Sequence, residues 1–215
     1  MIRAFLFDIG NVLLRFDFSL CLRAVAELSA VEDEADVLAR IDRIKWNYED
    51  GQIDRAAFLS SVFEVLQYRG EEAQFVAAWE DIFTPNEPMF ALVEQLAGRF
   101  PLYLLSNTSE IHRDHVFRAY PIFARFTSGT YSYSARASKP GRAIYETACR
   151  EHGLEPSTTF FIDDLLPNIE TARELGFVAH HYHPDRHEAL LAALQERGIA
   201  GIRSGAAAAG APAAG

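Results

Sequence analysis

Two acidic positions in this sequence directly follow apolar stretches of strand length. Asp8 comes after residues 3–7, and the pair Asp163-Asp164 comes after residues 159–162. Aromatic and β-branched residues dominate both stretches and a turn follows each, which is typical of buried strands in an α/β sheet. Ligands of such sheets bind just outside the carboxyl ends of the strands. The sequence therefore predicts that these carboxylates meet at one edge of a sheet.

Hydroxyl and amino groups are predicted at the same edge. Ser106 follows a third apolar run at residues 102–105, and Asn107 leads from it into the start of a helix. Lys139 precedes Pro140, which opens another predicted helix. Backbone amides at helix N-termini attract anions, so the Lys139 ammonium and these amides would face the same negative group. This pattern favours phosphate as the ligand.

A carboxylate, a cation and hydroxyl donors together are suited to phosphoryl transfer. Asp8 can attack phosphorus and form an aspartyl-phosphate, which divides one difficult displacement into two easier steps. The rest of that reaction is positioning and charge neutralisation. Asp8 and Asp164 would offer hard oxygen ligands to Mg²⁺, with Asp163 beside them and Asn168 orienting the loop from the start of the next helix.

Each of these residues has an ordinary structural explanation when it is taken alone. An Asp after a strand is most often a turn former or a helix cap, and a lone Lys is most often a solvated surface residue. Their occurrence in order, each at the end of a strand or the start of a helix on the same sheet edge, favours a phosphate site.

The elements that must position this site divide the chain into two parts. Residues 18–83 contain no convincing strand but have four segments with apolar residues at helical spacing, which predicts a helical cap at residues 16–85. Asp54 is expected to cap the third of these helices and Gly70 to end it. Helices and strands alternate after residue 86, except for a stretch at 127–133 without a clear assignment.

Alternation of this kind predicts a doubly wound, Rossmann-like parallel sheet with helices on both faces. Its core would comprise residues 1–15 and 86–203. The last twelve positions, 204–215, are almost entirely Ala and Gly and are predicted to be disordered.

The composition narrows the partners. The 215-residue chain has a formal charge of −10, which would repel nucleic acid and anionic lipid, so neither nucleic acid nor a membrane is an expected partner. No apolar stretch is long enough to cross a bilayer, and no signal-peptide cleavage site follows the first strand. Cys21 and Cys149 lack metal-type spacing and are expected to be buried free thiols, which fits the cytoplasm. The oligomeric state stays open.

The four motifs resemble those of the haloacid dehalogenase (HAD) superfamily of hydrolases, over about residues 1–200. They are the segments 8–12, 105–108, 139–145 and 161–169. A helical insert after the first motif is similar to the family's α-helical cap. The resemblance implies Asp8 as nucleophile and Asp8, Asp164 and the Gly10 carbonyl as Mg²⁺ ligands. It implies that Ser106, Asn107 and Lys139 contact the phosphate.

One position departs from the family pattern. Most phosphatases of the family have Asp-x-Asp in the first motif, and the second Asp protonates the leaving oxygen, whereas this chain has Gly10. Such acid-base help contributes about 10²- to 10⁴-fold. The branch that resembles the chain most, the bacterial glucose-1-phosphate phosphatases, shares this glycine, and an anomeric oxygen needs less protonation. A sugar phosphate such as glucose 1-phosphate is therefore the expected substrate.

Two alternatives remain. Without an acid at position 10 the site could bind phosphate or a phosphorylated ligand without turnover. A carbon-halogen hydrolase would also use an Asp nucleophile, but it needs no Mg²⁺. A resemblance to the dehalogenases would also imply a bulky residue near position 10, and this chain lacks one.

Several other polar and aromatic residues are weaker candidates. His112 is expected either to approach the substrate or to belong to an exposed polar helix face, and the histidines at 180–183 are interpreted as strand residues rather than metal ligands. The cap aromatics could form a ring-stacking sugar site, but their helical spacing favours packing within the cap's own core. Candidates for substrate hydroxyl contacts are Arg15, Asp17, Asn47 and Asp50, and candidates for the aromatic core are Trp46, Tyr48, Trp79 and Phe83.

Overall fold

The computed structural model describes residues 1–31 and 33–203. In that part of the chain the core is a five-stranded parallel sheet of order β5-β4-β1-β6-β7. The chain leaves the central strand β1 toward one edge and later returns to fill the other side, so β1 lies between β4 and β6. The strands are β1 (Ala4–Phe7), β4 (Leu102–Ser106), β5 (Ser128–Tyr131), β6 (Thr159–Asp163) and β7 (Val178–His181).

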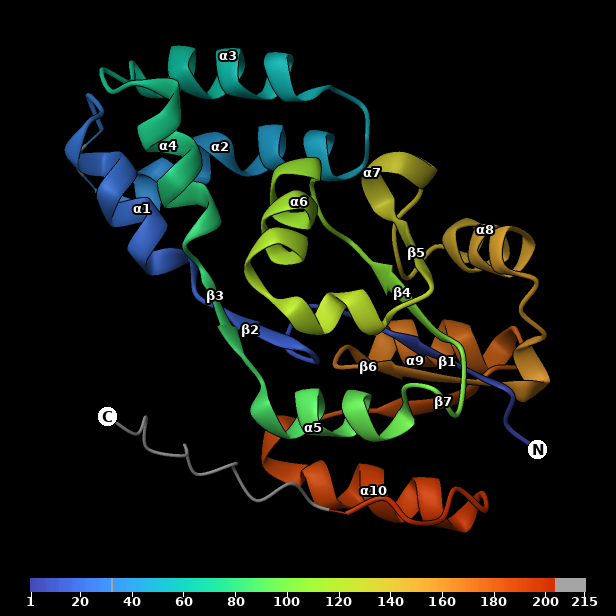
Figure 1. Cartoon of the computed structure of the whole chain (residues 1–215). Coiled ribbons are helices and arrows are strands. Elements are labelled where there is room, and N and C mark those ends of the chain that lie inside the picture. The colour runs from blue at the N-terminus through green and yellow to red at the C-terminus, as the bar shows by residue number, and fades with distance from the viewer. Residues whose placement is uncertain (32, 204–215) are drawn as a thin grey trace, which may run out of the picture.

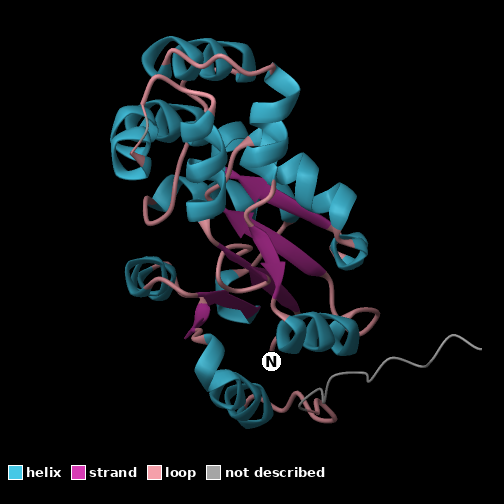
Figure 2. Cartoon of the chain, turned by 90° about the vertical axis from the view of Figure 1, so that its left-hand side faces the viewer, coloured by secondary structure: helices cyan, strands magenta, loops and turns pink. Residues whose placement is uncertain are grey.

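Helices cover both faces of this sheet, as the alternation of elements predicts (Figures 1 and 2). Successive side chains of a strand point to opposite faces. Phe5 and Phe7 accordingly pack with α5 and α10, and Leu6 packs on the other face with α8 and α9. The core helices are α5 (Glu87–Leu96), α6 (Glu110–Ala119), α7 (Ser132–Ala135), α8 (Arg142–His152), α9 (Leu166–Glu174) and α10 (His187–Glu196).

A bundle of helices with its own apolar core lies between β1 and β4 in the sequence. It appears at the top of both views (Figures 1 and 2), and Figure 1 shows it beside α6. Asp54 accepts a hydrogen bond from the Ala57 amide and caps α3 as predicted. We call this bundle the cap, as in the sequence analysis. Its helices are α1 (Phe18–Glu27), α2 (Glu34–Glu49), α3 (Arg55–Leu66) and α4 (Glu72–Glu80).

Short elements at the edges were not predicted. The two segments that connect the core to the cap pair with each other as a two-stranded antiparallel ribbon. Its strands are β2 (Leu14–Phe16) and β3 (Phe83–Pro85). The unassigned stretch at 127–133 forms β5 and the start of α7. Each of these strands has three or four residues and owes its conformation to hydrogen bonds with a partner strand, which periodicity in its own sequence does not reveal.

Two expectations about single residues were wrong. Helix α3 ends at Leu66 with Gln67 in the left-handed conformation (φ 47°), so Gly70 does not end it. A Cβ at Gly70 would lie 2.6 Å from the Tyr68 hydroxyl oxygen, so the glycine instead allows that side chain to pack closely. Cys21 is buried and free, but Cys149 is only half-buried.

None of the helices in the described residues has the length and apolar content needed to cross a membrane. The predicted Ala- and Gly-rich tail at 204–215 lies outside the described residues.

Candidate active site

Three carboxylates converge at the carboxyl ends of the central strands. Asp8 follows β1, Asp163 is the last residue of β6, and Asp164 follows it. Because Phe7 pairs with Ile162 in parallel register, the next residues of the two strands emerge side by side. One carboxylate oxygen from each of the three lies within 4.8 Å of the others. The parallel register thus places these three acidic side chains around one point.

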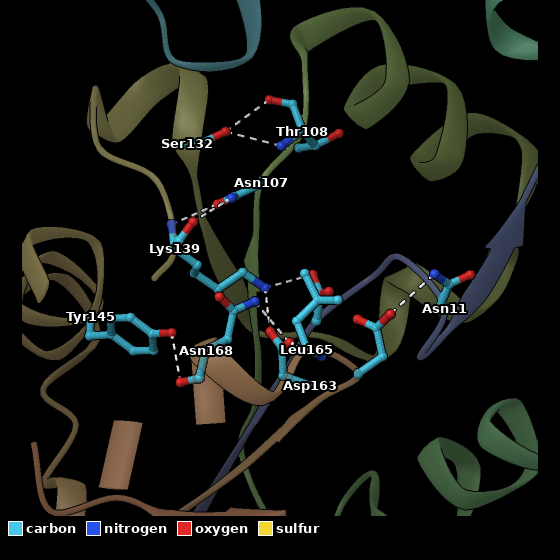
Figure 3. A network of polar contacts seen from close by, with 11 residues as sticks. Asn11, Asn107, Thr108, Ser132, Lys139, Tyr145, Asp163, Leu165 and Asn168 are labelled. Carbon is cyan, nitrogen blue, oxygen red and sulfur yellow. Dashed lines mark hydrogen bonds and ion pairs between the residues drawn. The ribbon is translucent and has the colours of Figure 1, made fainter. Parts of the chain in front are cut away.

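Lys139 joins this cluster from the loop before α8. Its Nζ lies 2.9 Å from Oδ1 of Asp8 and donates to Oδ2 of Asp163 at 2.6 Å, and the side chain is almost fully buried. The second oxygen of Asp163 accepts from the Leu165 amide at 2.8 Å and from Nδ2 of Asn168 at 2.9 Å. Both oxygens of Asp163 therefore have partners, and this residue holds Lys139 and Asn168 in place (Figure 3).

Burial and charge act against each other in this cluster. Burial raises the pKa of the Asp8 carboxyl, the Lys139 ammonium opposes that rise, and Asp163 and Asp164 add to it. Burial also raises the pKa of Asp164. Desolvation alone would lower the pKa of Lys139, but Asp8 and Asp163 outweigh it and raise the pKa, so the ammonium stays charged. An additional cation beside Asp8 and Asp164 would relieve their repulsion.

The loop after β4 is bonded to the Lys139 backbone. Nδ2 of Asn107 donates to the Lys139 carbonyl and Oδ1 of Asn107 accepts from the Lys139 amide, both at 2.9 Å (Figure 3). This pair of bonds fixes the loop next to the residue whose ammonium reaches Asp8. Ser106 is buried at the end of β4 and lines the same cavity as Asn107. The side-chain amide of Asn107 therefore holds the loop against the Lys139 backbone, and it is also a predicted phosphate contact.

Asn11 is a site residue that the sequence analysis did not single out. Its Nδ2 donates to Oδ2 of Asp164 at 3.1 Å, and its backbone is in the left-handed conformation (φ 51°). Asparagine tolerates that conformation better than most residues. A Gly-Asn pair directly after a strand was the available signal, since Gly10 and Asn11 form the turn that returns the chain toward β2.

The cluster opens into a cavity of about 240 Å³ between core and cap. Asp8, Lys139 and Asp164 lie in its wall, and Gly10 lines it close to the Phe16 ring. A Cβ built on Gly10 would lie 3.1 Å from an edge carbon of that ring. The remaining predicted residues, Ser106, Asn107 and Asn168, also line this cavity. Asp163 does not line it, but its carboxylate contacts Lys139 and Asn168, so the structure brings all the predicted residues together.

The cap contributes Lys45, Trp46 and Glu49 from α2 to the wall of this cavity. Nζ of Lys45 lies 2.9 Å from Oε2 of Glu49 and 4.6 Å from the centre of the Trp46 ring. Burial raises the pKa of Glu49 and Lys45 opposes that rise. The expectation that Trp46 belongs to the cap core was wrong, because its side chain is 48% exposed. Helical spacing identifies a face, but not whether protein or solvent covers it.

The residues proposed to contact substrate hydroxyls lie elsewhere. Asp17 caps α1 through the Ser19 amide, and the carboxylate of Asp50 accepts from the Ser138 hydroxyl. Arg15 lines a neighbouring cavity that shares Asn11, Phe16 and Asp164 with the first, and Asn47 is outside the wall of the first cavity. Lys45 and Glu49 are one turn apart on α2, and this spacing was the sequence signal that could have identified the face of α2 that lines the cavity.

His112 belongs to α6, directly after the loop that carries Ser106 and Asn107. It is buried rather than exposed, its ring stacks on Trp79 at 5.6 Å, and its Nε2 lies 2.8 Å from the Trp79 carbonyl oxygen. Nε2 must carry the proton to bond that carbonyl. Burial lowers the pKa of His112 to about 4, so the ring is neutral near pH 7. His112 thus joins core helix α6 to cap helix α4 and also lines the cavity.

This buried histidine makes stability depend on pH. His112 binds a proton below about pH 6.5 in the unfolded chain but only below about pH 4 in the folded protein. Falling pH therefore favours the unfolded chain, and the free energy of unfolding decreases. Between pH 7.5 and pH 5.0 we expect His112 to contribute a loss of about 2 kcal/mol. His112→Gln keeps a donor for the Trp79 carbonyl and should remove that contribution. Urea unfolding of both proteins at the two pH values measures it; equal losses would contradict the expectation.

The donor set at this site fits a hard divalent cation. Mg²⁺ prefers oxygen ligands and is commonly held by one or two carboxylates, with waters and phosphate oxygens completing its shell. Asp8 and Asp164 can present oxygens of this kind, whereas both oxygens of Asp163 already have partners. No sulfur or imidazole group belongs to the acidic cluster among the described residues.

Comparisons with known proteins agree with this geometry. The chain is 25% identical over 193 residues to a D-ribitol-5-phosphate phosphatase of Bacteroides thetaiotaomicron, covering 82% of this chain and 90% of that protein. A crystal structure of a HAD family enzyme from the same organism superposes with a TM-score of 0.80 at 27% identity, covering 88% of this chain and 98% of that one. A complex of that enzyme with magnesium and inorganic phosphate gives a TM-score of 0.76 at 27% identity, over 84% and 93%.

The sequence profile of the haloacid dehalogenase-like hydrolases matches residues 2–176, which include all the strands of the sheet up to β6 and every residue of the acidic cluster. That match covers most of the chain, and the parallel sheet agrees with the fold of the structural neighbours. The chain is therefore an enzyme of the haloacid dehalogenase-like hydrolase family.

Proposed function

We propose that this protein is a Mg²⁺-dependent phosphatase that hydrolyses a small sugar or polyol phosphate through an aspartyl-phosphate intermediate. The observation that carries the proposal is the position of Asp8, whose carboxylate lies against the Lys139 ammonium and opens into a cavity shared by core and cap. The negative charge of the chain supports a small-molecule substrate rather than a nucleic acid.

Asp8 has the role of nucleophile in this proposal. Its free oxygen attacks phosphorus, the bond from phosphorus to the leaving oxygen breaks, and water later hydrolyses the aspartyl-phosphate to regenerate the carboxylate. Lys139 touches Asp8 and stabilises the charge of the phosphoryl group as it transfers. Ser106 and the backbone amides of the same loop would donate to the other phosphoryl oxygens.

Mg²⁺ would be held by Asp8, Asp164 and the Gly10 carbonyl, and when bound it supplies positive charge to the phosphoryl oxygens. The contribution of the protein is to hold these ligands in place. Asn11 orients Asp164 through a 3.1 Å hydrogen bond, and Asp163 fixes Lys139 and Asn168. The relative bound to magnesium and inorganic phosphate supports this assignment.

Position 10 bears on the choice of substrate. Gly10 offers no acid for the leaving oxygen, and the Phe16 ring lies 3.1 Å from where its Cβ would be. A leaving group that carries negative charge well, such as an anomeric oxygen, needs less protonation, which favours a sugar 1-phosphate such as glucose 1-phosphate. The ribitol 5-phosphate named for the relative has an ordinary alkoxide instead. Both belong in the test.

The cap residues in the cavity wall suit a leaving group rich in hydroxyls. Lys45 and Glu49 compensate each other's charge, so together they offer a donor and an acceptor without attracting a second anionic group. Trp46 lies in the same wall, and its half-exposed ring adds apolar surface that the carbons of a sugar or polyol can contact. A cavity of about 240 Å³ limits the substrate to a small metabolite.

The two alternatives are weaker on the same observations. A module that only binds phosphate would not need a carboxylate placed against the ammonium and free to attack. A carbon-halogen hydrolase would not need two acidic residues suited to a divalent cation. Phosphate release and halide release distinguish all three possibilities.

The test is phosphate release from a panel that includes glucose 1-phosphate, ribitol 5-phosphate, other sugar phosphates and nucleoside monophosphates, with Mg²⁺ and with EDTA. We expect turnover that needs Mg²⁺ and is fastest on one sugar or polyol phosphate. 2-Chloropropionate is assayed in parallel for halide release. Phosphate binding without turnover on any compound would favour the binding module, and halide release would favour the dehalogenase.

A further inference from the structure

Ser132 is a buried serine that lies between the cap and the loop after β4. It is the first residue of α7, directly after the edge strand β5, and its side chain is completely buried. Its Oγ lies 2.5 Å from the Glu49 carbonyl oxygen at the end of cap helix α2. The same Oγ accepts from the Thr108 amide at 3.0 Å and lies 3.2 Å from the Thr108 carbonyl oxygen (Figure 3).

A hydroxyl has one proton, so Ser132 can donate to only one of these two carbonyls at a time. The shorter distance assigns the proton to Glu49 in this structure. If the cap moved away, the hydroxyl could turn to the Thr108 carbonyl without leaving a buried donor unpaired. Two arrangements of the same hydroxyl are therefore possible, and the position of the cap selects between them.

Both partners of Ser132 belong to the wall of the active-site cavity. Thr108 lines it and follows Asn107, whose amide is bonded to the Lys139 backbone. Glu49 lines it from the cap with its side chain, while its carbonyl bonds Ser132. A displacement of Glu49 by a ligand would thus act directly on the hydroxyl that holds the Thr108 amide.

A second contact fits the adjacent cap turn against the same part of the core. The Ser138 hydroxyl donates to the Asp50 carboxylate, one residue after Glu49. Gly51 is in the left-handed conformation (φ +67°), and a Cβ there would lie 2.1 Å from the Tyr133 carbonyl oxygen in α7. No other residue type could approach α7 so closely. The turn at the end of α2 is therefore built to contact the segment that begins at Ser132.

We propose that Ser132 is a positioning residue that couples the position of the cap to the geometry of the phosphate-binding loop through the Glu49 carbonyl and the Thr108 amide. The inference rests on the proposed function insofar as that loop binds phosphate. The coupling itself is a property of the folded chain and can be measured without substrate.

Hydrogen exchange with Ser132→Ala tests the coupling in the absence of ligand. The matched control is Ser134→Ala in the same helix, whose hydroxyl bonds only the nearby Tyr131 carbonyl. We expect faster exchange in Ser132→Ala both at the Thr108 amide and at the hydrogen-bonded amides of residues 50–52 in the cap turn, and no change at either place in Ser134→Ala. Faster exchange at Thr108 with an unchanged cap turn would overturn the proposal.

Ser138→Ala provides a second route should Ser132→Ala fail to fold, because Ser138 is only half-buried. It loosens the same cap turn and removes no hydrogen bond of Thr108, so coupling predicts faster exchange at Thr108 as well. Unchanged exchange at Thr108 when the cap turn is loosened would overturn the proposal.

A kinetic measurement separates coupling from simple support of the loop. For the best sugar or polyol phosphate of the panel, Ser132→Ala should lower kcat by about tenfold to a hundredfold, since small misplacements of reacting groups have effects of that size. Acetyl phosphate, which is too small to contact the cap, should lose less. Equal losses on both substrates would reject coupling, whereas absence of turnover in the unaltered enzyme would reject the proposed function and leave the exchange result standing.

Discussion

Asp8→Asn is expected to abolish turnover, by more than about 10⁴-fold, while the fold is retained. The amide has the shape of the carboxylate but cannot attack phosphorus. The altered enzyme should release no phosphate from the substrate that the unaltered enzyme hydrolyses fastest, and no aspartyl-phosphate should be trapped by denaturation during turnover. Activity near that of the unaltered enzyme would reject Asp8 as the nucleophile.

The same substitution should not destabilise the metal-free protein. Because burial raises the pKa of Asp8 above its ordinary value, ionisation of this carboxyl weakens the folded state as the pH rises past that ordinary value. A neutral Asn avoids this penalty, and Lys139 keeps its 2.6 Å contact with Asp163. We expect a melting temperature at pH 7.5 that is equal to or above that of the unaltered protein. Mg²⁺ should raise the melting temperature of the unaltered protein and have less effect on Asp8→Asn.

Lys139→Met is expected to lower activity less than Asp8→Asn does, but to have a large effect on stability. The ammonium lies between Asp8 and Asp163, so its removal leaves two buried carboxylates without a positive partner. Breaking a buried ion pair in this way typically costs about 3–5 kcal/mol. Loss of a charge that stabilises the phosphoryl group should lower kcat by about 10²-fold or more. Urea unfolding and phosphate release measure the two effects.

Lys139→Met/Asp163→Asn separates the two roles of the lysine. Neutralising Asp163 removes one of the unpaired carboxylates, while the amide oxygen can still accept from the Leu165 amide. The double variant should therefore regain part of the lost stability but none of the lost activity. Recovery of activity together with stability would mean that Lys139 acts only on folding. No recovery of stability would contradict the assignment of the penalty to the buried carboxylates.

Much of the fold could be predicted because its main elements have strong local patterns. The strand ending at Phe7 is uniformly apolar, and the cap helices have apolar residues at helical spacing, so both are determined within a window of a few residues. The strand Ser128–Tyr131 has no such pattern, and its backbone is extended because β4 offers hydrogen-bond partners along its length. Its conformation depends on residues more than twenty positions away.

The residues of the candidate site likewise divide into those that a local sequence pattern could locate and those that it could not. Asp8, Ser106 and Asp163 could be located from sequence because each ends a strand or directly follows one, and all strands of a parallel sheet end at one edge. Lys139 could be located because it stands just before a helix start. Their roles in catalysis stay predictions until the variants are measured. What local pattern supplies is the identity of the groups and the edge at which they emerge.

The sequence by itself thus determined the chemistry available at the sheet edge, since residue type and strand position are local properties. Only the tertiary structure decided what surrounds that chemistry. It placed Trp46 and Glu49 of the cap in the cavity wall, buried His112 against Trp79, and set Ser132 between Glu49 and Thr108. These contacts join residues that are tens of positions apart, and they exist because the cap packs on the core in one orientation. That orientation is determined by the complementarity of two folded surfaces, which no spacing along the chain encodes.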